Sequence, residues 1–285
     1  MMGPMSDIER HTLLVDCGDD KGLVHRVTGI LLDHSLNIIS NGEFVDPDRR
    51  HFFMRTEFSG ACNEERVSDE LRLALPADAK IRLVRRRRKR IVVLVTKEPH
   101  CLGDLLLRQA YGEFNAEILT VIGNHPTLES LARRFDVPFR HISHEGLSRD
   151  EHEAQILEEI HPHSPDFIVL AKYMRILTQA FVDRYSQRII NIHHSFLPAF
   201  AGAHPYRQAA ERGVKIIGAT AHFVTGNLDE GPIVAQDVIP VDHTHSATSM
   251  AQAGRDVEQV VLARALKLVF EERVFVSANR TVLFP

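Results

Sequence analysis

The 285-residue sequence predicts an α/β protein built from two domains. Residues 10–84 place four short apolar runs and two amphipathic stretches in the order βαββαβ. Residues 91–285 instead alternate continuous apolar runs with segments of helical periodicity, which is typical of a doubly wound, mainly parallel sheet. The basic run R-R-R-R-K-R at 85–90 separates the two patterns. It favours a solvated linker over a nucleic-acid patch, because a lone basic run is a weak motif.

The first domain is predicted to have the ferredoxin-like arrangement. Its helices are recognised by apolar residues on one helical face, and its strands by short apolar runs bounded by turn residues. In chain order, the expected elements are a strand at 11–16, a helix from Gly22, strands at 37–45 and 51–58 joined by the turn D-P-D-R, a helix that ends before Pro76, and a strand at 79–84.

The second domain is predicted from apolar runs of the kind that form buried parallel strands. The expected strands lie at 91–96, 116–123, 166–171, 189–192 and 216–224. The expected helices lie at 102–111, 126–135, 149–160 and 248–272, and two short β runs follow at 274–276 and 281–284.

The composition describes an ordinary soluble globular protein, with 44% hydrophobic and 25% charged residues. A formal net charge of -4 gives no general attraction to nucleic acid or membranes, and no apolar segment approaches the length of a membrane span. The three cysteines are widely spaced and odd in number, which favours a reducing compartment over a disulfide framework. We therefore expect a cytoplasmic protein with neither nucleic-acid nor membrane partners.

Three side chains with complementary chemistry are expected at one edge of the second sheet. Asn191 and His193 occupy alternate positions at the carboxyl end of a predicted strand, so they share a face where ligands gather in α/β sheets. A turn after the next predicted strand presents Asp229. A carboxamide can donate to an oxyanion, an imidazole can donate or accept, and a carboxylate can orient or deprotonate water. Together they suit acyl transfer, although each alone is more typical of a structural role: a cap for Asn191, a core histidine for His193 and a turn residue for Asp229.

The same region carries a longer motif. It reads N-x-H-x-S-x-L-P at 191–198, T-x-H-x-V at 220–224, and an aspartate before G-P-I at 229–233. In this motif the chain resembles the formyltransferases and hydrolases that use formyltetrahydrofolate. The resemblance extends the acyl-transfer hypothesis to a formyl group carried on folate.

The resemblance implies roles for the residues of the motif. Asn191 and His193 would hold the formyl oxygen, and Asp229 would position and deprotonate the attacking water. His222 would orient Asp229 or the water without itself contacting the substrate. An aspartate with an ordinary pKa near 4 is a weak base, so the identity of the general base stays open at this point.

A further stretch, L-A-K-Y-M-R-I-L at 170–177, resembles the family segment that lines the pterin pocket. The implied folate contacts are Met174, Arg175, Ile176 and Leu177. Taken alone, the stretch is equally typical of a strand end that runs into a packed helix.

The turn after the first strand of the second domain distinguishes between members of this family. Transferases that act on a sugar-phosphate amine have a glycine-rich loop there, whose amides bind the phosphate. This chain has K-E-P-H-C-L-G, in which Pro99 removes an amide and Glu98 repels an anion, although Lys97 and His100 could bind one. The departure favours a hydrolase.

The first domain resembles an ACT domain through the string D-x-x-x-x-x-G-L-V-x-x-V-x-x-x-L followed by N-I, from Asp16 to Ile38. Such domains pair through their sheets, which implies a homo-oligomer, and bind small amino acids near the first helix. The resemblance implies an effector site near Gly22 and Asn37. Glycine or methionine would suit a one-carbon enzyme as the effector, although no residue of the sequence selects either. The alternative is a dimerisation module without a ligand.

Seventeen histidines raise the alternative of a metal site. A catalytic zinc needs three well-placed ligands, often within H-E-x-x-H, and this motif does not occur in the sequence. The histidines considered are His193, His194, His204, His222, His243 and His245. We expect no metal and no other cofactor.

The sequence as a whole thus looks like the formyltetrahydrofolate hydrolases of this family, with resemblance from residue 10 to 285. The implied reaction is hydrolysis of 10-formyltetrahydrofolate to tetrahydrofolate and formate, linked to one-carbon metabolism and purine biosynthesis. Two alternatives remain. The chain could be a formyltransferase to an amine, or an amino-acid sensor with an inactive folate domain.

Overall fold

The computed structural model describes residues 9–198 and 205–285. The chain separates into two compact units, of which the first ends at Arg87 and also includes Phe284 and Pro285, and the second runs from Arg88 to Leu283. None of the helices within the described ranges is long and apolar enough to cross a membrane.

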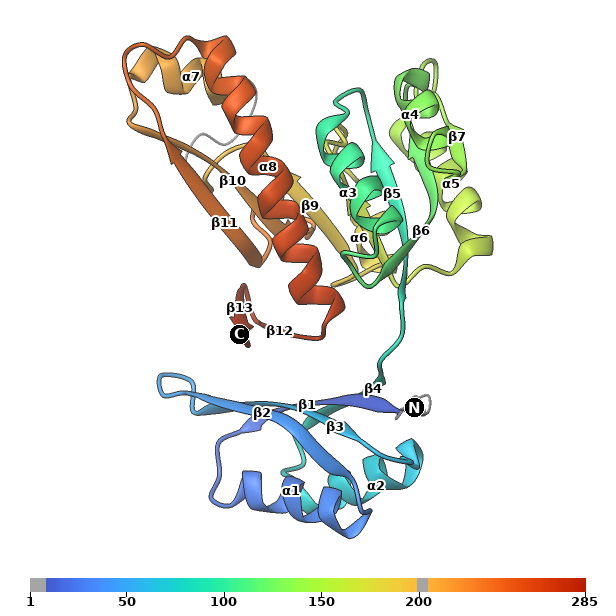
Figure 1. Ribbon diagram of the computed structural model, residues 1–285, viewed down its shortest axis with the longest axis vertical. Helices are drawn as coiled ribbons and strands as arrows, with labels where there is room; N and C mark the ends of the chain where they lie inside the picture. Colours follow the sequence, from blue (N-terminus) through green and yellow to red (C-terminus); the bar gives the residue numbers. More distant parts are fainter. Residues whose placement is uncertain (1–8, 199–204) are drawn as a thin grey trace, which may run out of the picture. The chain divides into compact units, whose positions relative to one another are not determined.

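The first unit has the predicted order βαββαβ. Its sheet is antiparallel, with strand order β2-β3-β1-β4, and α1 and α2 cover one face of it (Figure 1). Leu and Val side chains from both helices join one core with the inward residues of β1 and β3. The elements are β1 Arg10–Gly18, α1 Leu23–Asp33, β2 Asn37–Asp46, β3 His51–Ser59, α2 Glu64–Ala74 and β4 Lys80–Arg85.

The two helices of the first unit begin in different ways. Gly22 precedes α1 with φ of 81°, a left-handed conformation that costs glycine little. Asn63 caps α2 because its side chain accepts a hydrogen bond from the backbone N–H of Arg66. The second helix ends before Pro76, as predicted.

The predicted linker at 85–90 is too long. Arg85 is the last residue of β4, and Lys89 already pairs in register with Ala116 as the first residue of β5. Lys89 is also buried, with its ammonium group hydrogen-bonded to the carboxylate of Glu272. A buried ion pair and strand pairing therefore hold the end of the basic run within the second unit, and 86–88 alone lie between the two strands.

The second unit contains a seven-stranded sheet in the order β11-β10-β9-β8-β5-β6-β7. The strands from β9 to β7 are parallel, whereas β10 and β11 run antiparallel to their neighbours. The mainly parallel sheet was predicted. The elements up to β8 are β5 Lys89–Val95, α3 His100–Ala110, β6 Ala116–Gly123, η1 Pro126–Leu128, α4 Glu129–Arg133, β7 Phe139–His141, α5 Arg149–Ile160, η2 His161–His163 and β8 Phe167–Leu170. The remaining elements are α6 Gln179–Arg184, β9 Ile189–His193, α7 Pro205–Arg212, β10 Ile216–Phe223, β11 Ile233–Pro240, α8 Ala247–Phe270, β12 Val274–Ser277 and β13 Arg280–Leu283.

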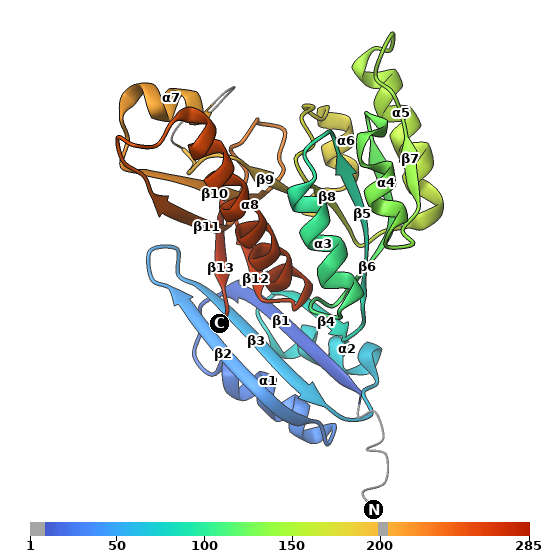
Figure 2. The ribbon, with the colours of Figure 1, turned by 45° about the horizontal axis from the view of Figure 1, so that its top comes forward.

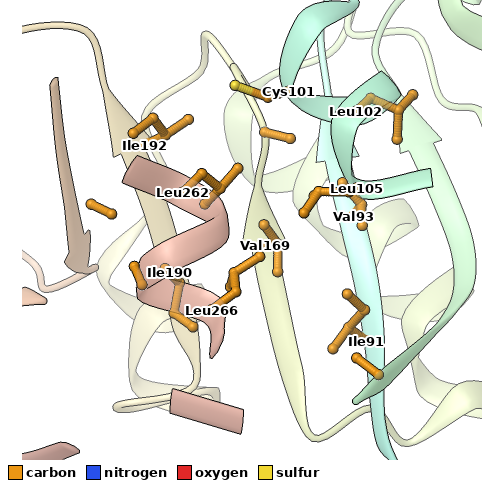
Figure 3. Close-up of a cluster of buried hydrophobic side chains, with 14 of the residues drawn as sticks. Ile91, Val93, Cys101, Leu102, Leu105, Val169, Ile190, Ile192, Leu262 and Leu266 are labelled. Carbon is orange, nitrogen blue, oxygen red and sulfur yellow. The ribbon is translucent and has the colours of Figure 1, made fainter. Parts of the chain in front are cut away.

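Helices cover both faces of this sheet. Ile91 and Val93 of β5 join a core with side chains of α3 and α8, which lie side by side (Figures 1 and 2). Figure 3 shows the α3 and α8 side chains of this core around the strands. Val92 and Leu94, on the opposite face, pack with side chains of α5 and α6. Because β5, β8 and β9 run parallel, their carboxyl ends lie at one edge of the sheet.

One predicted element of the second unit is shorter than expected. The helix predicted at 126–135 is a 3-10 turn, η1, followed by the five-residue helix α4. Pro126 begins the 3-10 turn, and the chain enters a left-handed conformation at Asp136, with φ of 56°. The three-residue strand β7 and the six-residue helix α6 were not predicted, because elements so short have little periodicity.

Candidate active site

A cavity of about 560 Å³ lies in the second unit, at the edge where β8 and β9 end. Its lining comes from the ends of β8, β9 and β10 and the segments that follow them, from the turn after β5 and the first residue of α3, and from α7 and α8. All the predicted catalytic, supporting and folate-binding residues line this one cavity: Met174, Arg175, Ile176, Leu177, Asn191, His193, His222 and Asp229.

Asp229 and His193 form a pair within the cavity. Oδ1 of Asp229 lies 3.2 Å from Nδ1 of His193, and both side chains are largely buried. Nε2 of His193 is also buried and has no hydrogen-bond partner among the described residues. A buried polar atom without a partner is unfavourable unless a ligand completes it, so Nε2 is available to a bound substrate.

The charge of this pair is set by its surroundings. Burial opposes ionisation of Asp229, but the hydrogen bond and charge of His193 outweigh that effect, so the pKa of Asp229 lies below its ordinary value. The carboxylate is therefore ionised at neutral pH. The negative charge strengthens the interaction of Asp229 with His193. The lowered pKa also makes Asp229 a weaker base than an isolated aspartate.

In the turn that presents Asp229, the backbone lies very close to neighbouring atoms at two glycines. Asp229 has φ of 57°, a left-handed conformation that aspartate tolerates better than most residues. A Cβ added to Gly231 would lie 1.8 Å from the carbonyl oxygen of Phe223. A Cβ added to Gly226 would lie 1.6 Å from Oε1 of Gln179. Gly231 thus lets the turn fold back against the end of β10, and Gly226 lets it approach α6.

His222, predicted to orient Asp229 or the water, lies closer to Asn191 than to Asp229. Asn191 and His222 are direct partners in the antiparallel pairing of β9 with β10. Nδ1 of His222 lies 2.9 Å from the carbonyl oxygen of Phe223, so this nitrogen is the donor and Nε2 is left to accept from Nδ2 of Asn191 at 3.2 Å. Burial lowers the pKa of His222, which keeps the ring neutral. Its Nε2 lies 3.9 Å from Asp229, beyond hydrogen-bond distance.

The predicted folate segment is an irregular stretch between β8 and α6. Met174 and Ile176 have 58% and 50% exposed side chains, and Leu228 beyond β10 is also exposed. Large exposed apolar side chains at a cavity are typical of a binding site for an apolar or aromatic ligand. The backbone N–H of Met174 donates to Oγ1 of Thr96, which ties the segment to the end of β5.

The sequence did not predict a second group of charged residues in the cavity, centred on Glu258 of α8. Nε2 of His100 donates to Glu258 at 2.8 Å, Nζ of Lys172 at 3.1 Å, and Oη of Tyr206 at 2.7 Å. Burial opposes ionisation of Glu258, but the bond from His100, the charge of Lys172 and the bond from Tyr206 outweigh it and lower its pKa to about 2. Sequence analysis could have noted Glu258 only as part of G-R-D-V-E, since its partners are distant in the chain.

The neighbouring residues Arg255 and His194 complete this region. Nε of Arg255 lies 3.2 Å from Oε2 of Glu98, in the turn that follows β5. The ring of His194 lies between His193 and Tyr206, with ring centroids 5.0 Å and 6.2 Å away. Burial, and then the charge of Lys172, lower the pKa of His194 to about 4. His194 is thus neutral at neutral pH.

Metal binding fits this chemistry poorly. Within the described residues, donor atoms of His100, Cys101 and Glu258 lie within 4.8 Å of one another. However, the Lys172 ammonium group already occupies Glu258, and burial raises the pKa of the Cys101 thiol well above its ordinary value. Among the histidines considered as ligands, His204 lies outside the described residues, and His245 pairs with Asp242.

The two predicted effector residues lie in the first unit and are not brought together. Asn37 begins β2 and pairs with Ser59, which is also the partner of Arg10 at the start of β1. Gly22 instead follows the far end of β1, where Gly18 pairs with His51. The two residues therefore lie near opposite ends of this sheet within one copy of the chain. The whole of α1 separates them in the sequence.

Comparison with known proteins identifies close relatives. The family model described as formyl transferase matches residues 89–266. Formyltetrahydrofolate deformylase of Haemophilus influenzae is 56% identical over 276 residues, which cover 97% of this chain and 99% of that protein. The formyltetrahydrofolate deformylase of Bacillus subtilis is 43% identical over 283 residues, covering 97% of this chain and 94% of that protein.

Solved structures give the same relationship. The crystal structure of a formyltetrahydrofolate deformylase from Pseudomonas syringae pv. tomato matches with a TM-score of 0.94 and 37% identity, covering 99% of this chain and 96% of that one. Glycinamide ribonucleotide transformylase 1 from Symbiobacterium toebii matches with a TM-score of 0.67 and 31% identity. That match covers 69% of this chain and 94% of the transformylase.

Proposed function

The chain belongs to the family of formyltetrahydrofolate deformylases, and from this premise we propose that it hydrolyses 10-formyltetrahydrofolate to tetrahydrofolate and formate. The observation that carries the proposal is the unpartnered Nε2 of His193, which is backed by Asp229 and lies in the same cavity as Asn191. The relatives with this activity in their names match nearly the whole chain, and the transformylase matches a smaller part of it.

The exposed apolar segment 174–177 supports a folate site in the cavity. Met174 and Ile176 offer apolar surface to the pterin ring, and Arg175 and Leu177 complete this part of the lining. The backbone is fixed there by the hydrogen bond from Met174 to Thr96. The folate would thereby carry its formyl group toward the end of β9.

Stabilisation of the oxyanion falls to Asn191 and His193. In the proposed reaction, water adds to the formyl carbon and its oxygen becomes an oxyanion. Nε2–H of a protonated His193 and the second N–H of the Asn191 amide donate to this oxygen, while His222 holds the amide through its other N–H. Each well-placed donor is worth about 3 kcal/mol in the transition state.

Asp229 has two roles in this proposal. Its carboxylate stabilises the protonated ring of His193 and holds the attacking water, whose proton it accepts as the new carbon–oxygen bond forms. Because its pKa is lowered, it takes that proton only as the attack proceeds. The bond between the formyl carbon and the folate nitrogen then breaks, the proton passes to that nitrogen, directly or through His193, and formate leaves.

The alternatives named from the sequence are less well supported. A formyltransferase needs a bound amine, and the turn after β5 carries Glu98 and Pro99 where a phosphorylated amine would need anion-binding amides. A sensor with an inactive folate domain would not need the His193–Asp229 pair. Hydrolysis gives a role to Asn191, His193, His222 and Asp229 and needs no bound amine.

For the first unit we propose an ACT-like domain that pairs two copies of the chain and binds a small amino acid such as glycine or methionine. Support comes from the βαββαβ order, from the free amide groups at the start of α1 after Gly22, and from exposed apolar side chains on the edge strand β2. Ile39, Phe44 and Val45 of β2 are between 39% and 45% exposed. Because Gly22 and Asn37 lie far apart in one copy, an effector touching both would need residues from two copies. A cytoplasmic enzyme of one-carbon metabolism and purine biosynthesis is the setting we propose.

Formate release without an added amine tests the proposed hydrolysis. The purified protein is incubated with 10-formyltetrahydrofolate, and formate and tetrahydrofolate are measured, with and without glycine or methionine. We expect equal amounts of both products in the absence of any amine. Turnover that begins only when an amine is added would instead establish a transferase.

A further inference from the structure

His194 lines the cavity but has no part in the mechanism proposed above. It follows His193, the last residue of β9, and its side chain is half-buried. The centroid of its ring lies 5.0 Å from that of His193 and 6.2 Å from that of Tyr206, with interplanar angles of 31° and 47°. The ring therefore packs against both the histidine of the catalytic pair and an aromatic ring of α7.

The hydrogen-bonding capacity of His194 is unused. Among the residues that the structure describes, neither ring nitrogen of His194 has a hydrogen-bond partner. The other two histidines of the motif differ, since His193 contacts Asp229 and His222 contacts Asn191. Because polar groups in partly buried places are normally hydrogen-bonded, His194 has a free donor and a free acceptor to offer a molecule in the cavity.

Groups on several neighbouring elements set the charge of this ring. Burial lowers the pKa of His194 to about 4, and the positive charges of Lys172 and His193 act in the same direction. The carboxylates of Glu258 and Asp229 oppose this effect but are outweighed. The ring is neutral at neutral pH, so one of its nitrogens can accept a hydrogen bond, which a protonated ring could not do.

The attacking water needs such an acceptor. A water molecule has two hydrogens, and the mechanism gives only one of them a partner, the ionised carboxylate of Asp229. A water held by one hydrogen bond can still rotate about it. A second acceptor beside His193 would fix the direction of the oxygen lone pair, which is the orientation that attack on a carbonyl carbon requires.

We propose that His194 is a further catalytic residue, whose neutral ring accepts a hydrogen bond from the attacking water. The water then lies between Asp229 and His194, with a lone pair directed at the formyl carbon. No proton moves to His194. As the carbon–oxygen bond forms, one proton of the water passes to Asp229, and the other stays on the new hydroxyl group until formic acid ionises. The inference rests on the proposed hydrolysis and deepens it.

Two substitutions separate this role from simple packing against Tyr206. His194→Phe keeps a planar ring and loses both nitrogens, whereas His194→Asn loses the ring and keeps an acceptor. A packing role predicts that the Phe variant is the more active of the two, and the proposed role predicts the reverse. His243→Phe is the matched control, because His243 is an exposed histidine of the same unit.

Formate release at saturating 10-formyltetrahydrofolate is measured for each variant, and folate affinity is measured by calorimetry. Loss of one hydrogen bond predicts that kcat of His194→Phe falls at least about tenfold, while His194→Asn and His243→Phe stay within about threefold of wild-type. Folate affinity should be nearly unchanged. A smaller loss in His194→Phe overturns the proposal, as does a loss in His194→Asn that equals it.

Chemical rescue gives a second measurement. His194→Gly leaves a space into which free imidazole fits, so added imidazole should restore part of its turnover and should leave wild-type turnover unchanged. A His194→Gly enzyme that binds folate but gains nothing from imidazole would also overturn the proposal. Wild-type enzyme is assayed in parallel. If it releases no formate, the proposed hydrolysis itself fails, whereas a failure of the present inference appears only in the variants.

Discussion

Replacing Asp229 by Asn tests the catalytic pair with little change in shape. Asp229 lies 3.2 Å from Nδ1 of His193, and its side chain is 12% exposed, so solvent screens this charge only weakly. The substitution removes both the stabilising charge on His193 and the acceptor for the water proton. General acid–base groups contribute about 10² to 10⁴ in rate, equivalent to about 3 to 5 kcal/mol of activation free energy. We therefore expect kcat to fall by about that factor.

The assay measures formate release at saturating 10-formyltetrahydrofolate and, separately, folate affinity by isothermal titration calorimetry. Affinity should be nearly unchanged, since the apolar lining near Met174 is untouched. Glu230→Gln is the matched control, because Glu230 is an exposed acid in the same turn and its carboxylate accepts from Asn227. This control should keep its turnover within about twofold. An Asp229→Asn enzyme that retains more than a tenth of wild-type kcat would refute the assigned role.

Five further outcomes are expected. His222→Phe removes the acceptor that lies 3.2 Å from Nδ2 of Asn191, so kcat should fall about tenfold, the equivalent of one hydrogen bond. An unchanged kcat would show that the Asn191 amide keeps its orientation without the hydrogen bond to His222. Gly231→Ala should destabilise the second unit by about 2 to 3 kcal/mol in urea unfolding, because its Cβ would lie 1.8 Å from a carbonyl oxygen. Gly103→Ala on α3, whose Cβ would meet its nearest neighbour at 4.0 Å, should instead stabilise it by about 0.5 to 1 kcal/mol. The pKa of Glu258 is lowered from 4.5 to about 2, so its charge stabilises the fold above pH 4.5 and this contribution is lost as the pH falls toward 2. The destabilisation caused by Glu258→Gln, measured against wild-type by unfolding, should shrink over that range, and a constant difference would contradict the assignment. Treatment with a chelator should leave turnover unchanged, whereas a loss restored by zinc would favour metal chemistry.

The residues of the catalytic motif could be predicted because the relevant spacing is local. Asn191 and His193 alternate along one strand, so their shared face follows from strand geometry alone. The mainly parallel sheet likewise followed from continuous apolar runs. The partner of His222 could not be predicted, because it depends on β10 running antiparallel to β9, which places His222 opposite Asn191.

The Glu258 network and the end of the linker could not be predicted for a related reason. His100 and Glu258 are 158 residues apart in the chain, and their contact exists only because α3 and α8 pack together. Lys89 appeared to be part of a solvated basic run, yet its partner Glu272 lies 183 residues away. Charge runs and isolated acids carry no local periodicity, so a sequence pattern does not reveal which of them are buried in pairs.

The surroundings of the two carboxylates in the cavity are the reason that we assign catalysis to Asp229 rather than to Glu258. Asp229 and Glu258 both have lowered pKa values and both contact a histidine. Glu258 is saturated, because it accepts from His100, Lys172 and Tyr206. Asp229 contacts His193 through one ring nitrogen and leaves the other nitrogen buried without a partner, so this pair alone has a donor to offer an incoming carbonyl. His194 lies next to His193 and is neutral at neutral pH, so it adds no positive charge beside that ring. In the proposed mechanism, one carboxylate–histidine pair of the cavity therefore serves catalysis, and the other carboxylate holds His100 and Lys172.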